Sequence, residues 1–88
     1  MQIDGSIVTE QGVTFAVVIV KPHVIQTQLT ADDARSGFAT IADFSGIPII
    51  LAAQDSAGVF TFQGRPDIVK FLASIDPTRI PWKRYSVS

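Results

Sequence analysis

The chain has 88 residues, of which 47% are hydrophobic and 17% charged, and its formal net charge is −1. Seven Lys and Arg residues against eight Asp and Glu leave no cationic excess to replace the counterions of a nucleic acid, so we expect no nucleic-acid partner. The chain has no cysteine, which excludes disulfides, thiolate catalysis and cysteine-ligated metals within it and favours a cytoplasmic location. The longest apolar run, residues 15–20, is too short to span a bilayer, so we expect no membrane partner.

A chain of this length corresponds to one domain, which we place over residues 1–88. Its charged fraction of 17% is low against about 25% in a typical globular domain, and so small a domain has little interior in which to bury apolar side chains. Monomers rarely expose large apolar patches. We therefore expect a homo-oligomer, with a dimer favoured, or a protein partner.

The first half of the chain predicts a β-hairpin followed by a helix. Apolar residues roughly alternate with small or polar ones over 3–9, which is the pattern of a strand with one solvated face. After a turn at 10–12, residues 13–20 are apolar on both faces, which is typical of a central strand covered on both sides. Thr30 predicts a helix N-cap, and Gly46 a helix end; between them the apolar stripe consists of Ala34, Phe38, Ile41 and Ala42.

The second half predicts two more strands and a second helix. An apolar strand over 47–53 and a short strand over 59–63 flank a turn, so they form a second hairpin. A helix begins at Pro66 and ends before Pro77, since the residue preceding a proline is driven out of the helical region. The pattern leaves open whether residues 82–87 add a closing edge strand.

This order, ββαββα(β), predicts an α+β fold: a two-layer sandwich of a mixed four- to five-stranded sheet and two helices. The helix that links 13–20 to 47–53 predicts a right-handed crossover between parallel neighbours. We expect both helices on one face of the sheet. The other face of 13–20 then lacks cover from its own chain and is the expected oligomer interface.

One segment resembles a known family. The stretch IPIILAAQDSAGVFTFQGRPDIVKFL, residues 47–72, is similar to the proline–strand–hairpin–helix half of thioredoxin-like proteins. The resemblance covers under a third of the chain. It implies a local architecture and no activity, because the chain has no cysteine to form a redox dithiol.

Polar residues after two strands form the first candidate site. Lys21 and His23 follow one strand and Asp55 follows the next. In open sheets with crossover helices, ligands bind beyond the carboxyl ends of parallel strands, and a histidine near an aspartate can carry a proton. The alternative is that Pro22 stops the strand and the two residues beside it are merely solvated.

Arg65 is the second candidate, because it stands between a glycine and the start of a helix. Free backbone N–H groups at that helix end, together with a guanidinium, can hold a phosphate or a carboxylate. Ordinary helix initiation is the alternative, since Pro66 removes one donor and Asp67 competes with the anion. The complete candidate site for an anionic ligand consists of Lys21, His23, Asp55 and Arg65.

The segment PWKRY, residues 81–85, is a candidate surface for a protein partner, since Trp, Tyr and Arg are enriched at interface hot spots. Its candidate partner-binding residues are Trp82, Arg84 and Tyr85. The alternative is an edge strand whose aromatic rings pack over the core while Lys83 and Arg84 keep the edge soluble.

No pattern in the sequence identifies a catalytic residue, and we expect no metal and no cofactor. One histidine and no cysteine cannot build a standard zinc site. The sequence favours a non-catalytic module that forms homo-oligomers or binds a partner. An anionic-ligand-binding protein or enzyme is the alternative, so the sequence does not decide whether the chain is an enzyme.

Overall fold

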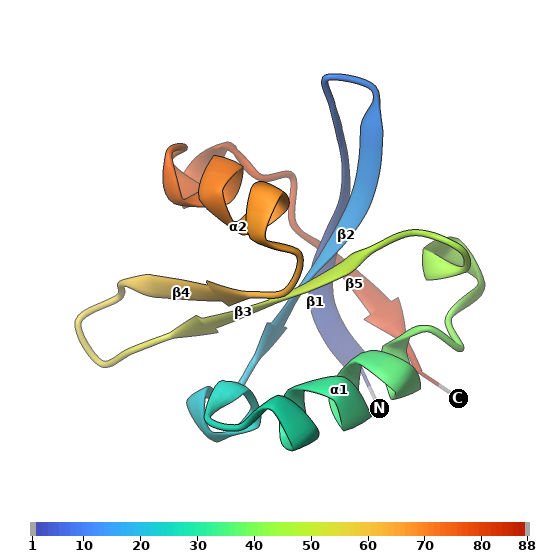
Figure 1. The fold of residues 1–88 in the computed structure, drawn as a ribbon, viewed down its shortest axis with the longest axis horizontal. Helices are drawn as coiled ribbons and strands as arrows, with labels where there is room; N and C mark the ends of the chain where they lie inside the picture. Colours follow the sequence, from blue (N-terminus) through green and yellow to red (C-terminus); the bar gives the residue numbers. More distant parts are fainter. Residues whose placement is uncertain (1, 88) are drawn as a thin grey trace.

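A five-stranded mixed sheet in the order β4-β3-β2-β1-β5 forms the centre of the computed structural model, which describes residues 2–87 (Figure 1). Its strands are β1 (Gln2–Glu10), β2 (Val13–Val20), β3 (Ile49–Gln54), β4 (Phe60–Gln63) and β5 (Lys83–Ser86). The two helices are α1 (Gln28–Phe38) and α2 (Pro66–Ala73), and 3₁₀ turns span Pro22–Ile25, Ala42–Phe44 and Pro77–Arg79. Within the described part of the chain, no helix is long and apolar enough to cross a membrane.

β1 and β2 form the predicted antiparallel hairpin. Glu10 faces Val13 across the two-residue turn. Both turn residues have positive φ, 51° at Gln11 and 79° at Gly12. This is the combination of a type I′ turn, whose twist matches that of the flanking strands.

β2 and β3 are parallel neighbours, with Ala16 beside Ile49. The chain passes from one to the other through α1, as the crossover prediction requires. The N-cap of α1 is Thr27, which accepts a hydrogen bond from the backbone N–H of Thr30 at 3.1 Å. The prediction of Thr30 as the cap is wrong, because its hydroxyl donates to the carbonyl of Val24 at 2.8 Å.

α1 also ends earlier than its apolar stripe predicts, at Phe38 and not near Gly46. The hydroxyl of Thr40 donates to the carbonyl of Gly37 at 2.7 Å and so competes for the end of the helix. Ile41 still packs on the core that α1 covers, but from the irregular segment after the helix.

The two helices cover opposite faces of the sheet (Figure 1). Ala16 and Val18 of β2 pack in one core with α1, whereas Phe15 and Val17 pack in a second core with α2. Alternate residues of a strand point to opposite faces, so the two apolar faces of β2 need two covers.

The predicted α+β class, mixed sheet and order are therefore confirmed, with β5 as the closing strand. The placement of both helices on one face is corrected, and the face expected to lack cover is occupied by α2. The Cα radius of gyration, 12.0 Å, matches the value of about 12 Å for a compact chain of this length.

β5 joins the sheet beside the first half of β1, where Gly5 faces Lys83. The rings of Phe44 and Tyr85 pack beside this glycine at 4.8 Å with a tilt of 58°. A Cβ at Gly5 would lie 2.8 Å from the carbonyl oxygen of Val17 and 3.6 Å from each ring. The close approach of β1 and the ring pair therefore requires glycine.

We expect Gly5→Ala to lower the free energy of unfolding by about 1–3 kcal/mol, because the new methyl group overlaps a backbone oxygen that cannot move alone. Urea denaturation measures the change. Gly37→Ala in α1 is the matched control, since a Cβ there meets nothing within 4 Å. The control keeps or raises stability, and an unchanged midpoint for Gly5→Ala would contradict the packing argument.

Candidate functional site

The parallel pairing of β2 and β3 brings Lys21 and Asp55 to the same end of these two strands, because each residue follows the carboxyl end of its strand. Both are exposed, as is His23 in the first 3₁₀ turn. The carboxylate of Asp55 accepts hydrogen bonds from the backbone N–H groups of Ala57 at 2.9 Å and Val59 at 3.0 Å. It therefore already serves to shape the β3–β4 turn.

Arg65 lies at the opposite end of β3. β4 is antiparallel to β3, so the chain after Gln63 returns to the amino end of β3, whereas Asp55 follows its carboxyl end. The guanidinium of Arg65 donates to both carboxylate oxygens of Asp67, at 2.8 and 2.9 Å. This contact lowers the pKa of the Asp67 carboxyl below its ordinary value. The structure thus separates Arg65 from the other three candidate ligand-binding residues.

Arg35 of α1, which the sequence analysis missed, connects three elements near the amino end of β3. Its guanidinium donates to the carbonyl of Ile49 at 2.8 Å and to the carboxylate of Asp32 at 2.8 Å. It also donates to the side-chain and backbone oxygens of Gln63 at the end of β4. Two of these acceptors are backbone carbonyls that only the folded chain brings together, so no sequence signal reveals them.

We expect Arg35→Ala to lower the free energy of unfolding by about 1.5–3 kcal/mol, since hydrogen bonds to charged groups contribute on that scale. Its side chain is only 23% exposed. Arg65→Ala is the matched control, because its ion pair with Asp67 is exposed to solvent and contributes little to stability. Thermal and urea unfolding of both variants measure the difference; equal losses would show that Arg35 does not tie these elements together.

The candidate partner-binding segment is divided between the core and the surface. Tyr85 is 8% exposed and packs against Phe44. Trp82 is half-buried, and its indole N–H donates to the carbonyl of Pro77 at 3.3 Å. Arg84 is exposed and pairs with a carboxylate of β1 at 3.3 Å. The edge-strand alternative therefore describes this segment.

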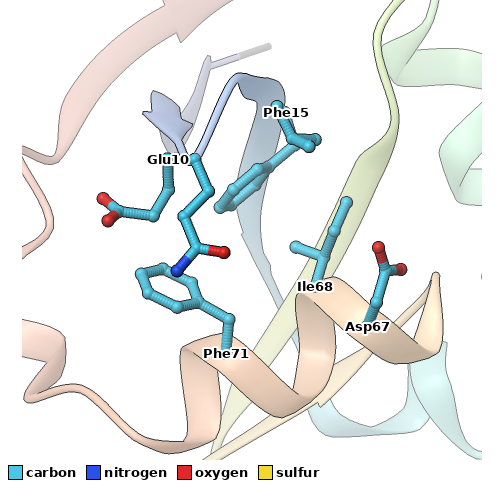
Figure 2. Close-up of a pocket in the computed structure, with 7 residues that line it drawn as sticks. Glu10, Phe15, Asp67, Ile68 and Phe71 are labelled. Carbon is cyan, nitrogen blue, oxygen red and sulfur yellow. The ribbon is translucent and has the colours of Figure 1, made fainter.

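A groove runs between α2 and the turn end of the β1–β2 hairpin. Two cavities of about 160 and 280 Å³ share Glu10 and Phe71 as lining residues, and the second extends along Val8 of β1. Figure 2 shows Glu10 and Asp67 on opposite sides of the first cavity, with the rings of Phe15 and Phe71 between them. The floor is apolar and the rim is charged.

This groove borders an open edge of β1. β2 pairs with β1 from Gly5 to Glu10, but β5 pairs with it only from Gln2 to Gly5. Among the described residues 2–87, no strand pairs with the second side of residues 6–10, and Figure 1 shows this end of the hairpin projecting beyond the rest of the sheet. Ile7, on this edge, is 37% exposed.

Ser6 begins this open edge and carries an unsatisfied polar group. It is 1% exposed, and its hydroxyl has no hydrogen-bond partner among residues 2–87. Ser6, Ile7 and Trp82 help to line a further cavity of about 310 Å³ beside the edge. Leaving a buried hydroxyl without a hydrogen-bond partner costs free energy, and here that hydroxyl lies next to an open strand edge.

Fold and surface together define a small α+β domain whose sheet is covered on both faces and open along part of one edge. Comparison of the chain with protein-family models, curated proteins and solved structures finds no match. The element order predicted for residues 47–72, two strands followed by a helix, is present as β3, β4 and α2.

Proposed function

We propose that this chain is a non-catalytic binding module that adds a strand from another protein chain to the open edge of β1. The observation that carries the proposal is that β1 has nine residues and β5 only four, which leaves residues 6–10 paired on one side. Unpaired N–H and C=O groups on such an edge bind an extended segment, and the pockets beside it accept alternate side chains.

Most of the open edge lacks the features by which proteins prevent strand addition, and the one charged residue among 6–10, Glu10, lies at its turn end. Residues 6–9, Ser-Ile-Val-Thr, contain no charge, no proline and no glycine, and three of them favour extended structure. The opposite edge is less suited. β4 has only four residues. These differences support β1 as the edge that binds.

The anionic-ligand alternative has less support. Arg65 lies at the far end of β3 and is paired with Asp67, while the carboxylate of Asp55 shapes a turn. No specific observation assigns a ligand to Lys21 and His23. The expected cytoplasmic location stays a prediction.

A peptide with the β1 sequence 4–11 tests the proposal. When it is titrated into the isotope-labelled chain, we expect amide chemical shifts to change at residues 6–10. Ile7→Lys places a charge on the edge and should weaken this binding at least about tenfold. Thr61→Lys on β4 is the matched control and should bind like the original chain. Shift changes that avoid residues 6–10, or equal binding by both variants, would overturn the proposal.

A further inference from the structure

We infer that the strand bound at this edge is β1 of a second copy, antiparallel, with the twofold axis at Val8. The inference rests on the proposed function of the β1 edge and names its partner. Two observations lead to it: the hydrogen-bonding direction of β1 and the pairing of its side chains.

The direction of the backbone groups selects the register. Residues that flank a two-residue turn form a hydrogen-bonded pair, here Glu10 and Val13, and such pairs alternate along an antiparallel ladder. Every second residue of β1 therefore bonds to β2, and Ile7 and Thr9 direct their N–H and C=O groups to the open edge. With the axis at Val8, Ile7 of each copy faces Thr9 of the other. All the outward groups of both residues are then paired.

The same register matches the side chains. Val8 faces Val8 of the second copy in the closer, non-hydrogen-bonded type of pair, which suits two β-branched side chains. Ser6 faces Glu10 of the second copy. The buried Ser6 hydroxyl, which has no partner among the residues described, thereby gains a carboxylate acceptor in the second copy.

Glu10 of the second copy, which faces Ser6, lies on the same face of the sheet as Ser6. Lys83 lies on the other face, because it is opposite Gly5 and its ammonium group lies over the Tyr85 ring. The contact that Glu10 makes across the interface is therefore with the Ser6 hydroxyl. In the described part of a single copy, Glu10 takes part in no ion pair. A twofold interface repeats each contact, so the contact between Ser6 and Glu10 forms twice, and the two five-stranded sheets join into one continuous sheet.

Single-cysteine variants test the inference, because the chain has no cysteine and any disulfide must join two copies. Residues in a non-hydrogen-bonded pair have Cα atoms about 4.5 Å apart, within the range of about 4.4–6.8 Å that a disulfide spans. Val8→Cys should therefore cross-link under mild oxidation at least about tenfold faster than Thr61→Cys on β4, since association raises the effective concentration of the thiol.

A mixture of Ile7→Cys and Thr9→Cys tests the register at exposed positions, which keeps the inference testable if Val8→Cys folds poorly. The disulfide between residues 7 and 9 should form in preference to 7–7 and 9–9. Preference for 7–7 or 9–9 would overturn the register. Slow, equal cross-linking of Val8→Cys and Thr61→Cys, or a monomeric mass for the unmodified chain at high micromolar concentration, would overturn the second copy as partner. If the β1 peptide still binds residues 6–10 in that case, the proposed function stands with another strand as its ligand.

Discussion

Burial of β2 on both of its faces is the constraint on which the other parts of the structure depend. Phe15, Ala16, Val17 and Val18 have exposures of 2% or less, and their side chains alternate between two separate cores. A strand of this kind needs a helix on each face and a strand on each edge. β1 and β3 supply the edges, and α1 and α2 supply the faces.

Because β1, β3, α1 and α2 all surround β2, few residues of the 88-residue chain remain to protect the outer edges of the sheet. At β4 the outer edge is short, because the strand has only four residues. At β1 the protection comes from β5, whose four residues match fewer than half of the nine in β1. The open edge beside Ile7 is therefore a consequence of how the faces are covered, and binding of another strand would complete the sheet.

The sequence predicted the elements wherever one residue type decides the local structure, as at the Gln11-Gly12 turn and at Pro66, which begins α2. It could not predict the face on which α2 packs, because one apolar stripe fits either side of a sheet that is apolar on both. The N-cap of α1 was misplaced for a related reason. Thr27 and Thr30 are both capable of capping, and the choice depends on the carbonyl of Val24, which occupies the second hydroxyl.

For the candidate sites too, the sequence predicted which residues lie together only where the local pattern also fixed the pairing of the strands. Lys21 and Asp55 lie at the same end of the sheet because the crossover by itself implies that β2 and β3 are parallel. Arg65 lies at the opposite end because β4 runs antiparallel to β3. The open edge of β1 has no motif, since it arises from unequal lengths of strands at the two ends of the chain. Recognition by strand addition uses backbone groups that every residue carries. Side chains contribute mainly by not obstructing it, so the proposed strand addition would leave no motif in the sequence.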